Sequence, residues 1–278
     1  MRKLLAALAI ALTATTMVAP PAVGQPLAEP ASATNVPDVP ARAWLLADPD
    51  SGRILASNNP YESHAPASTI KPLLAMVVLD QLPLNAVIRA SSAATDVECS
   101  CVGVKAGRSY TVRQLLDGLL LVSGNDAANT LADGLGGYQI AVAKMNAKAA
   151  AIGARNTHAS SPSGLDGPGM ESVTSPYDLA VIYREALRYP AFAAIVRQSS
   201  SLFPTDTGPH EIDSQNELLK RYPGTLVGKT GYTDLAQKTF VAAAQRGGHR
   251  LVVVEMYGDT DQFGPAIGLF DWGFSQYG

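Results

Sequence analysis

The chain has 278 residues, of which 47% are hydrophobic and 16% charged, and its formal net charge is −3. A charged fraction so far below the usual value of about 25% argues against disorder and against a coiled coil. The slightly acidic balance offers no long basic stripe, so we expect no nucleic-acid partner. The length allows one large domain or two small ones.

The N-terminus has the three-part pattern of a secretory signal peptide. Residues 1–3 are positively charged at Arg2 and Lys3, residues 4–19 are apolar apart from a few threonines, and the small residues 22–24 offer a cleavage site. The apolar run is slightly shorter than the ~20 residues of a spanning helix. We therefore favour a cleaved signal peptide over residues 1–24, with a retained N-terminal anchor as the alternative.

The predicted signal peptide places the protein outside the cytoplasm, in the bacterial periplasm or cell envelope or in the medium. No cysteine stands near the cleavage site for a lipid to attach, so membrane association is expected to be weak or absent. Residues 25–40 contain four prolines and no apolar period, which predicts a flexible or extended linker. One catalytic domain is expected over residues 41–278.

The domain is predicted to begin with a β-hairpin. Short apolar runs at 43–47 and 53–57 flank Asp48-Pro49-Asp50-Ser51-Gly52, whose residue types are typical of a turn. A mostly apolar helix is expected over 68–82, with Pro72 tolerated because it falls near the first turn.

The middle of the sequence has helical periodicity. Thr111 is a candidate N-cap for a helix over 111–122. Ser123-Gly124-Asn125 interrupts this helix, and the helical pattern resumes at 126–135, 138–152 and 176–188.

The last part of the chain returns to β character before a final helix. Strands are predicted at 225–229, 239–245 and 250–257, and an apolar helix at 263–274 is expected to pack on the core rather than lie on a membrane. Strands at both chain ends around a helical middle predict an α+β fold, in which one antiparallel sheet recruits both termini.

Cys99 and Cys101 are the only cysteines, and they are separated by one residue. Thiols outside the cytosol tend to oxidise, and an i, i+2 pair can just meet the geometry of a disulfide. Two cysteines without an adjacent histidine do not complete a zinc site. We favour a local structural disulfide; inert thiols and a redox role remain open.

Common hydrolase motifs are absent from the sequence. There is no Gly-x-Ser-x-Gly string, and the four histidines (His64, His158, His210 and His249) form no metal-binding spacing. Phosphate-binding glycine loops are also missing. We therefore expect neither a metal nor another cofactor.

Three short strings stand out together in chain order. They are Ser68-Thr69-Ile70-Lys71 at a helix start, Ser123-Gly124-Asn125 at a helix break, and Lys229-Thr230-Gly231 on a late strand. Each string alone is a weak signal, but the ordered set is much more specific.

The first string has the chemistry of a nucleophile beside its base. Residues three apart on a helix leave the same face, so the side chains of Ser68 and Lys71 can meet. The apolar residues that follow Lys71 can desolvate its ammonium group, which favours the neutral amine. A neutral lysine can accept the serine proton, as histidine does in other acyl-transfer enzymes. A surface lysine on an amphipathic helix is the alternative for this string in isolation.

This ordered set resembles the penicillin-recognising serine acyltransferases, which comprise penicillin-binding proteins and serine β-lactamases. The nearest likeness is to the secreted low-molecular-mass D-alanyl-D-alanine carboxypeptidases. Further strings support it: residues 48–52, Pro66-Ala67, Ser123 to Ala127, Ser163-Gly164-Leu165-Asp166 and Lys229 to Thr233. The likeness covers residues 40–278 and implies a β-lactamase/transpeptidase-like fold.

The resemblance also implies a role for each catalytic residue. Ser68 is the acylated nucleophile and Lys71 its general base. Ser123 relays a proton to the leaving amine. The implied activity is removal of the terminal D-Ala from peptidoglycan stem peptides, with β-lactam antibiotics acting as acylating inhibitors.

Substrate contacts follow from the same resemblance. Asn125 orients the substrate amide, and Lys229 with Thr230 holds the terminal carboxylate. The backbone N–H groups of Ser68 and Tyr232 form the oxyanion hole.

Two alternative functions remain open. A β-lactamase or related esterase is disfavoured because the Glu-x-x-x-Asn loop pattern of class A enzymes does not occur between residues 126 and 228. A non-catalytic penicillin- or cell-wall-binding module is disfavoured because it needs no Ser-x-x-Lys. Many related carboxypeptidases continue into a β-rich domain and a C-terminal anchor, and we expect neither here.

Overall fold

The protein was analysed as a computed structural model that describes residues 34–277. The predicted signal peptide and residues 25–33 of the predicted linker lie outside the described residues. Between residues 34 and 277, no helix combines the length and the apolar character needed to cross a membrane.

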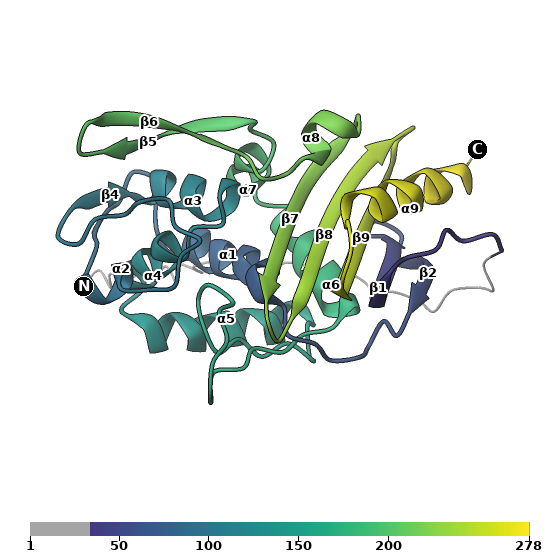
Figure 1. Ribbon diagram of the computed structural model, residues 1–278, viewed down its shortest axis with the longest axis horizontal. Helices are drawn as coiled ribbons and strands as arrows, with labels where there is room; N and C mark the ends of the chain where they lie inside the picture. Colours follow the sequence, from purple (N-terminus) through teal and green to yellow (C-terminus); the bar gives the residue numbers. More distant parts are fainter. Residues whose placement is uncertain (1–33, 278) are drawn as a thin grey trace, which may run out of the picture.

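A five-stranded antiparallel sheet in the order β2-β1-β9-β8-β7 organises the fold (Figure 1). Its strands are β1 (Ala41–Asp48), β2 (Arg53–Asn58), β7 (Thr225–Thr233), β8 (Gln237–Arg246) and β9 (His249–Gly258). Because β1 pairs directly with β9, the sheet joins the two ends of the described chain. The predicted α+β class and the sheet built from both ends are confirmed.

Helices cover both faces of this sheet. The helices of the described residues are α1 (Lys71–Gln81), α2 (Ser92–Thr95), α3 (Val112–Leu121), α4 (Asn125–Gly134), α5 (Tyr138–Ile152), α6 (Pro176–Ala186), α7 (Pro190–Ile195), α8 (Leu218–Arg221) and α9 (Phe263–Ser275). Helix α9 packs on one face and α6 on the other, while α2 to α5 gather beside α1 (Figure 1). The C-terminal helix therefore packs on the core, as predicted.

Strand β9 shows how the sequence divides its side chains between the two layers. Leu251 and Val253 belong to the apolar cluster under α9. Val252 and Val254, which alternate with them, belong to the larger cluster that contains α1 and α6. Alternation along a strand sends successive side chains to opposite faces, so this continuous apolar run is typical of a strand buried on both sides.

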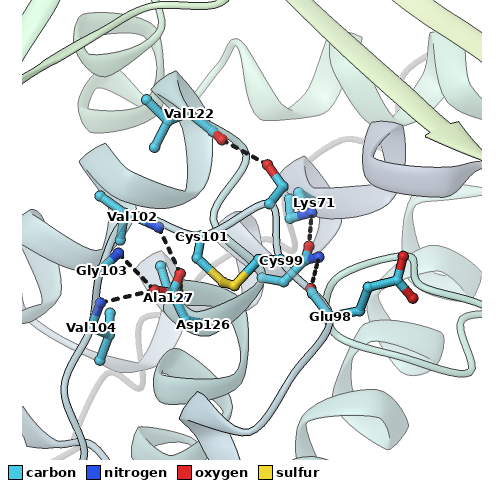
Figure 2. Close-up of a disulfide and its surroundings, with 12 residues drawn as sticks. Lys71, Glu98, Cys99, Cys101, Val102, Gly103, Val104, Val122, Asp126 and Ala127 are labelled. Carbon is cyan, nitrogen blue, oxygen red and sulfur yellow. Dashed lines mark hydrogen bonds between the residues drawn. A yellow bond between two sulfur atoms is a disulfide. The ribbon is translucent and has the colours of Figure 1, made fainter.

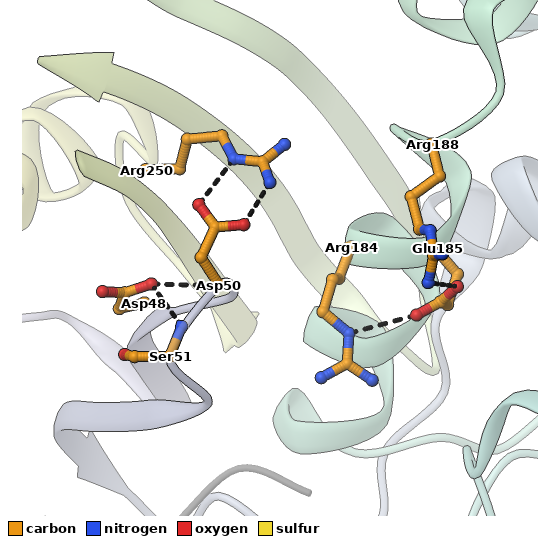
Figure 3. A network of polar contacts seen from close by, with 7 residues as sticks. All are labelled: Asp48, Asp50, Ser51, Arg184, Glu185, Arg188 and Arg250. Carbon is orange, nitrogen blue, oxygen red and sulfur yellow. Dashed lines mark hydrogen bonds and ion pairs between the residues drawn. The ribbon is translucent and has the colours of Figure 1, made fainter. Parts of the chain in front are cut away.

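The predicted hairpin between β1 and β2 is present, and its turn is held by polar contacts (Figure 3). The Asp48 carboxylate accepts the N–H groups of Asp50 and Ser51 at 2.8 and 3.0 Å. Asp50 forms an ion pair with Arg250 of β9. The Tyr277 hydroxyl donates to Asp48 at 2.8 Å, so the end of the chain secures the turn at its start.

The first helix begins later than the predicted residue 68. Residues Ala67–Ile70 form a 3-10 turn, η1, and the Lys71 N–H donates to the Ser68 carbonyl. In an α-helix the Ser68 carbonyl would accept from the N–H of residue 72, and Pro72 has no N–H. The prediction that Ser68 lies on the α-helix is therefore wrong by one turn, although Ser68 and Lys71 still share a face.

Two small two-stranded sheets were not predicted. One pairs β3 (Val87–Arg89) with β4 (Ser109–Thr111) across a long segment that contains α2, and the other is the hairpin of β5 (Ser200–Thr205) and β6 (Gly208–Asp213). Predicted helix α3 does begin after Thr111, whose side chain forms a capping box with Gln114. Helix α4 then begins at Asn125, so the break at 123–124 lies between two rigid supports.

Candidate active site

The Ser68 and Lys71 side chains are in direct contact. Lys71 Nζ lies 2.6 Å from Ser68 Oγ. It also donates to Asn125 Oδ1 at 2.8 Å and to the Ser163 carbonyl at 2.8 Å. The lysine is fully buried, with 0% of its surface exposed, whereas Ser68 is half-buried. The three partners match the three N–H bonds of a lysine ammonium group.

The surroundings of Lys71 favour its neutral form. Burial lowers the pKa of Lys71 well below its usual value, the nearby Lys229 lowers it further, and Asp126 opposes the shift. A neutral amine keeps two N–H donors and gains one lone pair. The carbonyl oxygens of Asn125 and Ser163 can only accept, so those two donors face them and the lone pair faces Ser68 Oγ. The predicted desolvation of this lysine is confirmed.

Ser123 lies at the break between α3 and α4 with an unusual backbone. Its φ is +62°, a left-handed conformation that is uncommon for residues other than glycine. The neighbouring amides fix this turn, because the Gly124 N–H donates to the Gly118 carbonyl and the Asn125 N–H to the Ser100 carbonyl. Such local strain is often found at functional sites, where it directs a side chain.

Lys229 connects the edge strand β7 to this turn. Its Nζ donates to Ser123 Oγ at 2.8 Å and to the Thr230 carbonyl at 2.6 Å. Only 5% of its surface is exposed, and burial lowers the pKa of Lys229 to about 7. The three strings identified from the sequence therefore meet at one place.

A cleft of about 390 Å³ opens between β7 and the helical region. Ser68, Ser123, Thr230, Gly231 and Tyr232 are among its lining residues, and the Tyr232 side chain is 59% exposed. A Cβ at position 231 would lie 2.9 Å from the Ser68 nitrogen, so only glycine lets β7 approach η1 this closely.

Gly164 allows a second close approach. Its φ is +86°, and a Cβ there would collide with the carbonyl oxygen of Ala67, the residue before Ser68. This contact brings the Ser163 carbonyl to Lys71 Nζ. The string containing both residues supported the family resemblance, but sequence reasoning assigned no role to the Ser163 carbonyl.

Asn125 is more deeply embedded than a substrate-orienting residue needs to be. Its Oδ1 accepts from Lys71, and its Nδ2 donates to the Glu98 carbonyl at 2.7 Å. The Glu98 contact was missed because it uses a backbone atom, which has no residue-type signal. The predicted contact between Asn125 and the substrate amide stays a prediction.

Cys99 and Cys101 form a disulfide, with an S–S distance of 2.01 Å. The favoured sequence interpretation is confirmed, and inert free thiols are excluded because neither cysteine is free. The redox role stays a prediction that this bond does not test. Across residues 34–277, no group of three His, Cys, Asp or Glu side chains is placed to hold a metal ion.

The fold and this meeting of three strings define the class of protein. A sheet made from both chain ends, with a Ser–Lys pair beneath its edge strand, is the arrangement expected of a penicillin-recognising serine acyltransferase. Within that class, the chain belongs to the peptidase S11 family of D-alanyl-D-alanine carboxypeptidases, whose profile matches residues 30–260. It is a serine carboxypeptidase, and the family acts on peptidoglycan peptides and binds penicillins.

Individual relatives agree with this assignment. The chain is 58% identical to the D-alanyl-D-alanine carboxypeptidase DacB2 of Mycobacterium tuberculosis over 252 residues, which cover 89% of this chain and 87% of the relative. It is 30% identical to DacF of Bacillus subtilis, over 85% of this chain and 63% of that longer protein.

Solved structures show the same fold. The crystal structure of a D-alanyl-D-alanine carboxypeptidase from M. tuberculosis H37Rv matches with a TM-score of 0.86 and 56% identity, over 89% of this chain and 96% of that one. The Streptomyces K15 DD-transpeptidase matches with a TM-score of 0.81 and 28% identity, over 87% of this chain and 100% of the other.

Proposed function

We propose that Ser68 is the nucleophile of this carboxypeptidase and that Lys71 is its general base. The observation that carries the proposal is the 2.6 Å contact between Lys71 Nζ and Ser68 Oγ, with the lysine fully buried. A neutral Lys71 presents its lone pair to the serine hydroxyl and keeps both N–H bonds on fixed carbonyl oxygens. The base is thus held in place before the substrate arrives.

In the acylation step, Lys71 takes the Ser68 proton while Oγ attacks the carbonyl carbon of the penultimate D-Ala. The new C–O bond gives a tetrahedral oxyanion, which the N–H groups of Ser68 and Tyr232 stabilise. Preorganised donors of this kind contribute about 2.7–4 kcal/mol each. The exposed position of Tyr232 beside the cleft supports this role for its backbone.

Collapse of the intermediate breaks the peptide C–N bond and requires a proton on the leaving nitrogen. Ser123 is proposed to relay it, because its hydroxyl is held by Lys229 and lines the cleft. The Ser123 hydroxyl gives its proton to the leaving nitrogen and takes in return the proton that Lys71 removed from Ser68, so both side chains regain their starting forms. Free D-Ala then departs, and water hydrolyses the Ser68 ester to release the shortened peptide.

Lys229 and Thr230 are proposed to bind the terminal carboxylate of the substrate. Both belong to the edge strand, and Thr230 lines the cleft. A charged hydrogen bond contributes about 1.5–3 kcal/mol. Asn125 is proposed to orient the substrate amide.

The decisive experiment combines penicillin labelling with peptide turnover. The purified protein should gain the mass of one penicillin on the peptide containing Ser68, and it should release D-Ala from a model peptide ending in D-Ala-D-Ala. Ser68→Ala should lose both activities while keeping its circular dichroism spectrum. Rapid penicillin hydrolysis without D-Ala release would favour a β-lactamase, and labelling of another serine would overturn the assignment.

We further propose that the chain is exported after cleavage of residues 1–24, with the linker over 25–40 and the catalytic domain over 41–278. The positively charged, apolar N-terminus supports export, and so does a disulfide, which persists in oxidising compartments. Membrane association is proposed to be weak or absent. Mass spectrometry of the secreted chain tests the cleavage site.

A further inference from the structure

The disulfide loop lies directly against the proposed base machinery. Cys99 and Cys101 are bonded to each other on either side of Ser100. The Ser100 carbonyl accepts the Asn125 N–H at 2.6 Å, and the Glu98 carbonyl accepts Asn125 Nδ2 at 2.7 Å. Both the backbone and the side chain of Asn125 are therefore held by this loop.

A buried carboxylate secures the other end of the same loop (Figure 2). Asp126 is 2% exposed and accepts the N–H groups of Val102, Gly103 and Val104 at 2.8–2.9 Å. The loop is thus fixed to the first turn of α4 on both sides of the disulfide.

These contacts determine which end of the Asn125 amide faces Lys71. Because Nδ2 donates to the Glu98 carbonyl, Oδ1 must point toward Lys71 Nζ, 2.8 Å away. If the Glu98 carbonyl moves, the amide can rotate and present Nδ2 to the lysine. The lysine lone pair would then accept from Asn125, and it would no longer face Ser68 Oγ.

We propose that the Cys99–Cys101 disulfide is a positioning element of the active site, which holds the Asn125 amide in the orientation that directs the Lys71 lone pair at Ser68. This inference rests on the proposed roles of Ser68 and Lys71. The bridge closes over Ser100, so the Ser100 carbonyl lies within the closed ring and the Glu98 carbonyl belongs to the peptide unit that leads directly into it at Cys99. Breaking it frees the backbone between Glu98 and the segment held by Asp126.

The bridge is open to a chemical test. Cys99 is exposed, so a dithiol reductant can reach it. The reductant transfers two electrons and two protons to the bridge, which yields two thiols, while the reductant becomes a cyclic disulfide. The chain has only two cysteines, so reduction affects no other bond.

The experiment measures the second-order rate of acylation by a labelled penicillin in the oxidised, reduced and Cys99→Ser/Cys101→Ser proteins. Rates are normalised to the sites labelled at saturation, and melting temperatures are recorded in parallel. Loss of one oriented charge-assisted hydrogen bond predicts a roughly 10- to 100-fold slower reaction in the reduced and double-serine proteins. Reductant should not change the rate of the double-serine protein.

The pH profile separates positioning from general destabilisation. Lys71 must be neutral to act, so acylation rises with pH through its pKa. Rotation of the Asn125 amide removes an acceptor from the Lys71 ammonium, while the charges of Lys229 and Asp126 stay in place. Without the bridge, the pH at which acylation rises should therefore become lower, while the maximal acylation rate falls. A purely structural role would lower the amount of active protein and leave the limb unmoved.

A double-mutant cycle tests the route through Asn125. In an Asn125→Ala background, breaking the bridge should change the remaining acylation rate less than about twofold. Equal acylation rates and pH limbs in oxidised and reduced wild-type protein would overturn the inference, as would an undiminished effect in Asn125→Ala. Absence of any labelling of the oxidised protein would instead overturn the proposed function.

Discussion

The rate of peptide hydrolysis should fall at alkaline pH as Lys229 loses its charge, and this fall should occur only for substrates with a terminal carboxylate. Burial lowers the pKa of Lys229 to about 7, so its charge is lost as the pH rises through neutrality. Only the ammonium form attracts a carboxylate. Raising the pH should therefore weaken recognition of a D-Ala-D-Ala peptide, even though it favours the neutral Lys71 required for attack.

The magnitude follows from the titration of this one group. Above pH 7, each pH unit lowers the protonated fraction of Lys229 about tenfold, so kcat/KM for the peptide should fall with rising pH until it levels off at the rate supported by the uncharged side chain. Lys229→Ala should lower kcat/KM at pH 6 by roughly 10- to 150-fold, as expected for one charged hydrogen bond. The same variant should show no alkaline limb.

The assay compares two substrates over pH 5 to 10. One is a peptide with a free terminal carboxylate, and the other is an amide or thioester analogue without it. The analogue should show the rising limb of Lys71 but no decline from Lys229, and it should lose far less on Lys229→Ala. Equal alkaline limbs for both substrates, or equal losses in the variant, would refute carboxylate recognition by this residue.

Three other substitutions test the site. Lys71→Arg keeps a charge but cannot deprotonate, so penicillin acylation should fall at least about 100-fold; a rate near the parent's would contradict the base assignment. Gly164→Ala should lower the melting temperature and the acylation rate more than the control Gly169→Ala. Both glycines have positive φ, but only at position 164 would the new Cβ collide with a backbone carbonyl oxygen, so equal effects would contradict this packing argument. The buried Lys229 binds its proton more weakly in the folded than in the unfolded protein, so the parent loses stability as the pH falls from 10 to 7. Over that range, the free energy of unfolding of Lys229→Met should rise relative to the parent by on the order of 3 kcal/mol, and the difference should level off below pH 7. Denaturant unfolding at several pH values checks the sign.

The elements predicted best from the sequence are those in which local residue types and the pattern of buried residues indicate the same secondary structure. Thr111 has both an N-cap side chain and a glutamine three residues later, and the helix begins where that pattern places it. The alternating layers of β9 explain its continuous apolar run. In the active site, the three strings were identifiable because their functional atoms belong to side chains.

Other features depend on contacts that residue types do not encode. The β5–β6 hairpin contains Pro204 and several exposed polar residues, so it lacks the apolar alternation of a half-buried strand. The Ser163 and Glu98 carbonyls that complete the base machinery are backbone atoms, brought from 92 and 27 residues away along the chain. The 3-10 turn at Ser68 could have been predicted from the missing N–H of Pro72.

The strand order also dictates when the enzyme becomes competent during its synthesis. Ser68 is made early, but the edge strand that carries Lys229 is connected to β1 only through β8 and β9, and β9 pairs with β1 from the start of the domain. Such distant pairings must overcome a large loop-closure entropy before they are stabilised, which makes folding slow. We therefore expect a nascent chain to hold Ser68 without the cleft, so that it is neither active nor a target for penicillin until nearly the whole domain has emerged.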